Sequence, residues 1–284
     1  METREWALIL FTVLSQAAIG AFILLTWFRQ RNRDTAMDGA YRKSSLALLG
    51  VTAVGLLASL AHLGRPLLAV TALGNLGSSW LSREIFFSGG FFVLLLASVL
   101  LEKQPATRRM IDWLASLAGV LAVLSMSAVY IRTMMPAWQG FNTFVAFLGT
   151  MALLGAATAG GLLVTFGRGQ EPVARDLQAL LWVAVGALVV ELAVLPLYLA
   201  TLGAGAEAAQ AAAALLAGKY GAALVLRWAL VLVGGLVPLL VVWRKLSSGQ
   251  VDVNSVYAAL AFILVGEVIG RYLFYATGVH IMIG

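Results

Sequence analysis

Long apolar segments recur along the whole chain and are separated by short polar stretches. The segments cover residues 6–28, 44–61, 84–101, 111–131, 142–166, 179–201, 220–243 and 255–277. A helix of about 20 apolar residues crosses the hydrocarbon core of a bilayer. Membrane barrels instead show shorter segments with alternating polarity, a pattern this sequence lacks. We therefore predict an all-α, polytopic integral membrane protein, a bundle of eight transmembrane helices that forms a single domain over residues 1–284.

Composition supports this class. Of the 284 residues, 61% are hydrophobic and only 11% are charged, whereas soluble domains have about 25% charged residues. The formal net charge of +6 could suggest a nucleic-acid partner. In a membrane protein, however, basic residues mark the cytoplasmic loops. We therefore expect the lipid bilayer as the partner and no nucleic acid.

The distribution of Lys and Arg between the loops predicts the orientation of the protein. Most basic residues fall in the odd-numbered loops: Arg29, Arg31, Arg33, Arg42, Lys43, Lys103, Arg108, Arg109, Arg168, Arg175, Arg244 and Lys245. The opposite side carries fewer: Arg4, Arg65, Arg83, Arg132 and Lys219. Loops rich in Lys and Arg stay in the cytoplasm. Both termini should therefore lie on the outer, periplasmic side.

Two outward connections are long enough to offer a docking surface. Residues 62–83 contain several glycines, and residues 202–219 contain the Ala-rich stretch GAEAAQAAAALLAG. Alanine is the best helix former, so we expect a short interfacial helix in the second connection.

Six ionisable residues fall within or at the ends of the predicted spans: Arg83, Glu84, Glu191, Arg227, Glu267 and Arg271. A charge at the centre of a membrane helix costs about 2.5 to 3.5 kcal/mol, so each needs a partner or a function. Glu267 and Arg271 are four residues apart and can pair on one helix face. Glu191 and Arg227 can pair between neighbouring helices. For the five residues other than Glu84, two roles remain open: structural ion pairing, or a place near the head group of a ligand.

The segment SLAHLGRPLLA places His62 at the outward end of the second span. Gly64 permits unusual backbone conformations, and Pro66 ends or turns a helix. An irregular backbone at membrane depth is tolerated when it lines a cavity, although His62 could also simply cap the helix. A cavity with an imidazole and the carboxylate of Glu84 suits a quinol, since each group can accept a hydroxyl proton.

The sequence offers few ligands for a redox centre of its own. It has no Cys and two His, His62 and His280, so it cannot bind a thiolate-ligated iron–sulfur cluster or two bis-histidine haems. We expect no haem or metal in this chain. Electrons from a quinol would then pass directly to a cluster in a partner docked on the outer face.

The residues resemble a known family over essentially the full length. The matching pieces are EWALILFTVLSQ with IGAF, LASLAHLGRP, SREI, KYG with Arg227, and GEVIGRYLFY. In this order, with eight spans, the chain is similar to the membrane-anchor subunits of dimethyl sulfoxide reductases, the DmsC type.

This resemblance implies a haem-free anchor that oxidises menaquinol in a bacterial or archaeal cytoplasmic membrane. Its partners would be an iron–sulfur electron-transfer subunit and a molybdenum-pterin catalytic subunit, which carries out the terminal reductase chemistry. The family's quinol-site histidine, in an H-L-G-x-P segment, maps onto His62, with Gly64 and Pro66 in the same segment. The family's acidic residue at the start of the third helix maps onto Glu84.

Other functions fit part of the pattern. A related anchor could run in reverse and reduce quinone with electrons from a dehydrogenase, since site residues do not fix direction. A proton-coupled transporter would use the buried Glu and Arg residues as ligands, but we find no inverted repeat. A purely structural anchor would need His62 and Glu84 only for local hydrogen bonds.

Overall fold

The computed structural model describes residues 3–32, 37–62, 66–170, 172–248 and 250–281, which form helices and connections without any strand. The helices are α1 (Thr3–Arg31), α2 (Asp38–His62), η2 (Pro66–Asn75), α3 (Trp80–Leu100), α4 (Pro105–Ile131), α5 (Phe141–Phe166), α6 (Pro172–Gly203), α7 (Glu207–Ala217), α8 (Gly221–Ala229), η3 (Leu230–Gly235), α9 (Leu236–Ser247) and α10 (Val253–Ala276). Within this part of the protein, eight helical segments are long and apolar enough to cross a membrane. The all-helical class and the eight predicted spans are confirmed.

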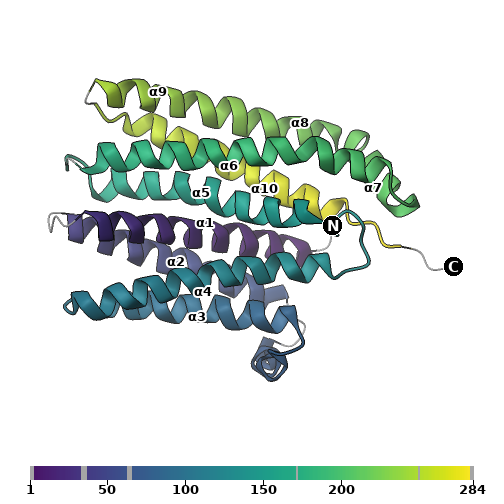
Figure 1. Ribbon diagram of the computed structural model, residues 1–284, viewed down its shortest axis with the longest axis horizontal. Helices are drawn as coiled ribbons and strands as arrows, with labels where there is room; N and C mark the ends of the chain where they lie inside the picture. Colours follow the sequence, from purple (N-terminus) through teal and green to yellow (C-terminus); the bar gives the residue numbers. More distant parts are fainter. Residues whose placement is uncertain (1–2, 33–36, 63–65, 171, 249, 282–284) are drawn as a thin grey trace.

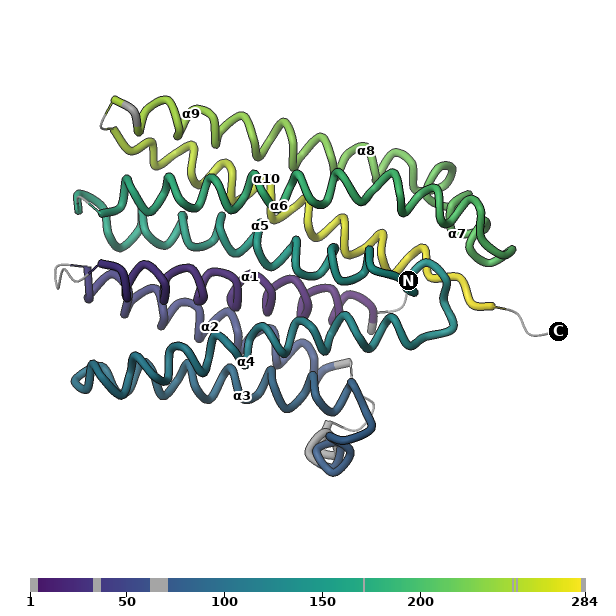
Figure 2. The backbone as a smooth tube through the Cα atoms, viewed as in Figure 1, coloured from purple at the N-terminus to yellow at the C-terminus, as the bar shows by residue number. Residues whose placement is uncertain are grey.

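The spans run side by side, alternating in direction (Figure 1). One end of the bundle, which we call the terminal face, holds both termini together with η2 and α7 (Figure 1). The other end, the loop face, holds the connections α1–α2, α3–α4, α5–α6 and α9–α10 (Figure 2). The short helix predicted in residues 202–219 is confirmed as α7. In the predicted connection 62–83, η2 is seen end-on beside the bundle, so its axis runs across the spans (Figure 2).

Several helices start earlier than their apolar patterns predict. The predicted starts at residues 44, 111 and 179 were wrong by six or seven residues, because α2, α4 and α6 begin at Asp38, Pro105 and Pro172. Proline is well suited to the first helical position, where no N–H is needed. Helix α3 begins at Trp80, and the Ser79 side chain accepts a hydrogen bond from the backbone N–H of Ser82.

Ion pairs on the loop face explain how charged residues can continue these helices. Arg29 of α1 lies 3.1 Å from Asp38 of α2, and Arg42 of α2 lies 2.5 Å from Glu102 in the α3–α4 connection. These pairs tie the first and third loops together. A sequence pattern based on apolar residues stops at such charges, although the helix does not.

The seventh span contains a stretch of π-helix, whose turns are wider than those of an α-helix. Helices α8 and α9 are joined by η3, a π-helical segment that ends just before Pro238. A proline ring clashes with the carbonyl four residues earlier and donates no hydrogen bond, so helices adjust locally around it. The glycines of η3 lie against α10, where a Cβ atom at Gly234 would meet the Phe262 ring.

Helices α1 and α5 approach each other through two glycines. A Cβ atom at Gly155 of α5 would lie 2.6 Å from the Cα atom of Gly20, and one at Gly20 would overlap the Met151 carbonyl. Small residues at helix crossings let backbones approach closely in membranes. This contact holds the middle of the bundle together.

Replacing Gly20 with alanine should destabilise the folded protein by about 3 kcal/mol, because both neighbouring atoms belong to backbone that cannot move aside easily. Thermal unfolding in detergent would measure the loss. Gly186→Ala on α6 is a matched control, since a Cβ atom there meets nothing within 4 Å and alanine favours the helix. Equal melting temperatures for the two variants would contradict the proposed role of the α1–α5 contact.

Candidate functional site

The predicted His62 segment lies where α2 ends at the terminal face. Helix α2 ends at His62 and η2 starts at Pro66. The side chains of His62 and Pro66, and the whole of Gly64, lie outside the described residues. The assignments of these three residues therefore stay predictions.

Glu84 lies one turn inside α3 rather than at its start, because the helix begins at Trp80. Its side chain is half-buried. Among the described residues, no hydrogen-bond or ion-pair partner of the Glu84 carboxylate is found. The neighbouring Arg83 is not available to it, because its guanidinium donates to the carbonyls of Leu76 and Gly77, both at 2.8 Å.

Arg83 therefore organises the connection before α3. In addition to these two hydrogen bonds, its guanidinium carbon lies 4.2 Å from the centre of the Trp80 ring, a cation–π contact. Whether Arg83 also lies near a ligand head group stays a prediction. Among the described residues, the neighbouring Glu84 has no cation as a partner.

Two tyrosines are hydrogen-bonded to each other between α4 and α10. The hydroxyls of Tyr130 on α4 and Tyr275 on α10 are 2.8 Å apart. Their rings belong to an aromatic cluster with Trp138 and Phe274, in which the Trp138 indole N–H donates to the Phe274 carbonyl at 2.7 Å. This pair and its aromatic cluster link α4 to α10 near the terminal face.

Arg271 has no ion pair with Glu267 among the described residues, so the i, i+4 pairing that the spacing allows is not formed. Its guanidinium donates to Gln16 Oε1 of α1 at 2.8 Å and lies 3.7 Å from the centre of the Phe147 ring. Arg271 and Glu267 each have their partners on other helices. Spacing along one helix cannot reveal such partners. Gln16, an uncharged polar residue in the first span, was not singled out by the sequence analysis.

Glu191, Arg227 and Glu267 form an ion cluster between three helices. Arg227 of α8 lies 2.9 Å from Glu191 of α6 and 3.4 Å from Glu267 of α10. Thr150 of α5 donates to Glu267 at 2.5 Å. The two carboxylate side chains are only 5% and 2% exposed. The predicted Glu191–Arg227 pair is confirmed, and Glu267 extends it.

Glycines make room for this cluster. A Cβ atom at Gly149 would overlap the Glu191 carboxylate, and one at Gly270 would lie 2.5 Å from Arg227 Nε. At Gly266 it would overlap Val231, so Gly266 and Gly270, four residues apart on α10, let the neighbouring span approach closely. Gly149 carries no sequence signal of its own, because its partner lies on another helix.

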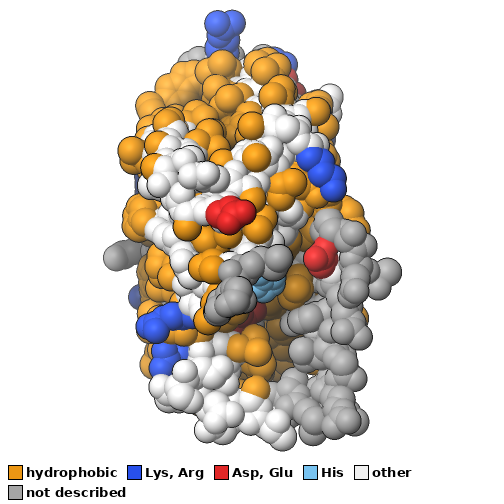
Figure 3. Space-filling model, turned by 90° about the vertical axis from the view of Figure 1, so that its right-hand side faces the viewer, with side chains coloured by type: hydrophobic (Ala, Val, Ile, Leu, Met, Phe, Trp, Pro, Cys, Tyr) orange, Lys and Arg blue, Asp and Glu red, His pale blue; other side chains and the backbone are white. Residues whose placement is uncertain are grey.

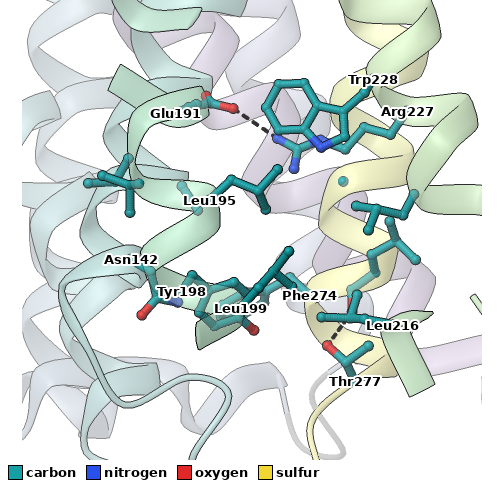
Figure 4. A pocket seen from close by; sticks show the side chains of 16 residues that line it. Asn142, Glu191, Leu195, Tyr198, Leu199, Leu216, Arg227, Trp228, Phe274 and Thr277 are labelled. Carbon is teal, nitrogen blue, oxygen red and sulfur yellow. Dashed lines mark hydrogen bonds and ion pairs between the residues drawn. The ribbon is translucent and has the colours of Figure 1, made fainter. Parts of the chain in front are cut away.

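A recess opens beside the ion cluster, between α5, α6, α7, α8 and α10 (Figure 4). Its cavity volume is about 100 Å³, and it is partly open to the outside. We call it the α6–α8 recess and define it by its lining residues: Asn142, Val145, Ala146, Glu191, Val194, Leu195, Tyr198, Leu199, Leu216, Leu224, Arg227, Trp228, Gly270, Leu273, Phe274 and Thr277. In Figure 4, Glu191 and Arg227 occupy one end, and Asn142 and Thr277 the other.

Chemically, the surroundings of Glu84 and the α6–α8 recess can both bind uncharged groups that carry hydroxyls. Carboxylates, phenols and an indole N–H can exchange or share protons with such a ligand. Over residues 3–32, 37–62, 66–170, 172–248 and 250–281, no three His, Cys, Asp or Glu side chains gather where they could hold a metal ion.

Comparison with known proteins places this geometry in a family. The sequence is 33% identical over 296 residues to the anaerobic dimethyl sulfoxide reductase protein YnfH of Escherichia coli (strain K12), covering 99% of this chain and 96% of that protein. It is 33% identical over 292 residues to the C subunit of the anaerobic dimethyl sulfoxide reductase of the same strain, with the same coverage. The corresponding C subunit from Haemophilus influenzae is 32% identical over 167 residues, 56% of this chain and 59% of that protein.

The family profile of the DMSO reductase anchor subunit (DmsC) matches residues 1–277. Together with the eight apolar helices, this match indicates an integral membrane protein that anchors a dimethyl sulfoxide reductase complex and associates with its catalytic and iron–sulfur subunits. The chain belongs to the DMSO reductase anchor subunit (DmsC) family.

Proposed function

We propose that this protein binds quinol at the terminal face, oxidises it with His62 and Glu84, and passes the electrons to an iron–sulfur subunit docked on that face. Menaquinol is the substrate that the family resemblance implies. The molybdenum-pterin subunit would then use the electrons for the terminal reduction. The anchor itself would reside in a bacterial or archaeal cytoplasmic membrane.

The observation that carries this proposal is the state of the Glu84 carboxylate. It is half-buried in α3, and within the described part of the protein it has no hydrogen-bond or ion-pair partner, while Arg83 is committed to Leu76 and Gly77. A carboxylate at membrane depth normally pairs or serves a function. A quinol hydroxyl would supply the missing donor.

The chemistry requires two proton acceptors. Oxidation of a quinol to the quinone releases two electrons and two protons, one proton from each hydroxyl. Imidazole and carboxylate can each accept one, and we assign these roles to His62 and Glu84. Pro66 and Gly64 would shape the backbone that admits the ring, and Arg83 would hold the connection in place.

The orientation of the complex follows from the same assignments. Basic residues are concentrated at the loop face, which the positive-inside rule assigns to the cytoplasm. Charged side chains on the terminal face are few and scattered among apolar and uncharged ones (Figure 3). We therefore assign the terminal face to the periplasm and propose that η2 and α7 contribute to the docking surface for the iron–sulfur subunit.

A His62→Ala variant tests the proposed site. We expect quinol oxidation by the purified complex to fall at least about ten-fold, because the variant loses one positioned proton acceptor, which water can replace only in part. Reduction of the terminal acceptor with an artificial soluble donor should be unchanged, and both partner subunits should remain bound. His280→Ala is the matched control, since His280 is exposed near the C-terminus. Unchanged quinol oxidation in His62→Ala would make His62 a helix cap.

Turnover should also be electroneutral. If protons and electrons both leave the quinol at the terminal face, no charge crosses the membrane. Proteoliposomes containing the complex should therefore build up no membrane potential during quinol oxidation, as measured with a potential-sensitive dye. A potential that collapses on addition of an ionophore would contradict the proposed route of protons or electrons.

A further inference from the structure

The α6–α8 recess lies on the other side of α10 from the Glu84 region. Arg271 and Tyr275 turn one face of α10 toward Gln16 of α1 and Tyr130 of α4. Gly270, Leu273 and Thr277 of the same helix line the recess. The recess therefore lies mainly on the face of α10 that is turned toward α6 and α8, and Phe274, which also contacts the Tyr130 ring, forms its boundary with the aromatic cluster.

Polar atoms beside the recess lack partners. Among the described residues, Glu191 Oε1, Arg227 Nε and Trp228 Nε1 are buried without a hydrogen bond. All three residues line the recess, and their side chains lie together at one end of it (Figure 4). Unsatisfied polar groups are costly in a membrane, where no water replaces the missing partner. Small rotations of these side chains would let a ligand oxygen bond both an N–H and a carboxylate.

The rest of the lining is apolar. Val194 and Leu195 of α6 and Leu224 of α8 form walls, and Phe274 offers a ring face. No residue of α8 is fully buried, and the recess, which α8 helps to line, is partly open to the outside. A long apolar tail could leave the recess between α6 and α8.

The charges of the ion cluster select the kind of head group. Two carboxyl groups, those of Glu191 and Glu267, already share the single guanidinium of Arg227, so the cluster has no free cation for a phosphate, which would also lose its hydration at this depth. A small uncharged ring with hydroxyl or carbonyl oxygens fits better. Its oxygens can accept from the Trp228 and Arg227 N–H groups, and a hydroxyl can donate to Glu191.

We propose that the α6–α8 recess is a second binding site for an isoprenoid quinol or quinone, with its ring near Glu191, Arg227 and Trp228 and its tail between α6 and α8. The site does not depend on the assignment of His62 and Glu84. It gives the ion cluster a ligand to position in addition to its structural role.

The test uses a photoreactive azido-quinone with the purified full-length protein and the subunits that accompany it. Cross-linked peptides are mapped by mass spectrometry. We expect labelling of α6 or α8 peptides that line the recess, in addition to α2–α3 peptides. Val194→Phe should fill the recess and weaken the labelling of α6 and α8 peptides about ten-fold. That factor corresponds to a loss of about 1.4 kcal/mol in binding free energy through overpacking. Val189→Phe is the matched control, because Val189 is 59% exposed on the same helix.

A second variant guards against misfolding. Trp228→Phe keeps an aromatic ring but removes the N–H, and it should also weaken recess labelling while the α2–α3 labelling persists. Recess labelling that is absent, or that is equal in the parent, Val194→Phe and Val189→Phe, would overturn the proposal. So would a phospholipid found by native mass spectrometry to be retained in the parent and lost in Val194→Phe. If the parent protein is labelled on recess peptides but not on α2–α3 peptides, the result would contradict the His62–Glu84 site and still support the second site.

Discussion

Replacing Arg227 with methionine should cost the protein most of its stability, about 3 to 5 kcal/mol. The substitution leaves Glu191 and Glu267, whose side chains are 5% and 2% exposed, without their shared cation. Methionine keeps much of the volume, so the loss is electrostatic rather than a matter of packing. The yield of monodisperse protein and the melting temperature in detergent would both measure it.

Neutralising the two carboxylates tests whether their lost cation causes the instability. Adding Glu191→Gln and Glu267→Gln to Arg227→Met removes both uncompensated charges, so most of the lost stability should return. Arg227→Lys should be intermediate, because an ammonium keeps the charge but lacks the planar guanidinium whose Nη2 atom contacts both carboxylates. Arg109→Met, at an exposed position on the loop face, is the matched control. A melting temperature for Arg227→Met equal to that of Arg109→Met would mean that the cluster contributes little.

The same cluster illustrates what the sequence can predict. Hydropathy and length suffice for the eight spans, because lipid requires long apolar helices whatever their neighbours are. The Glu191–Arg227 pair could also be predicted, since two opposite charges in consecutive spans have few alternatives. The partner of the third member, Glu267, could not be predicted, because Arg271, four residues away on the same helix, was an equally suitable cation.

Contacts between distant helices account for what was missed. Thr150 and Gln16 look like ordinary polar residues in apolar spans, and only the packing of α5 and α1 against α10 gives each a charged neighbour. Gly149 is similar, because its role is to leave space for Glu191. The charged helix starts at the loop face were missed for a related reason, since Arg29 and Asp38 are paired across the α1–α2 connection.

At the terminal face, Glu84→Gln should lower quinol oxidation by the complex about a hundred-fold or more, the usual contribution of a positioned proton acceptor. Glutamine has nearly the shape of glutamate and can still accept a hydrogen bond, but it cannot take up the proton of a quinol hydroxyl. Because the described residues provide no cation or donor for Glu84, its replacement by a neutral amide breaks no ion pair in that part of the protein. Melting temperature and subunit assembly should therefore stay close to those of the parent.

Three measurements distinguish this proton-accepting role from a structural one. Steady-state quinol oxidation should be lost, reduction of the terminal acceptor by an artificial soluble donor should persist, and Glu84→Asp should retain part of the quinol activity because it keeps a carboxylate. Glu207→Gln is the matched control, since Glu207 is exposed at the start of α7 on the same face. If Glu84→Gln oxidises quinol as fast as Glu207→Gln, the proton must leave by another group. The unpartnered carboxylate of Glu84 would then need a different explanation, such as a contact with the docked iron–sulfur subunit.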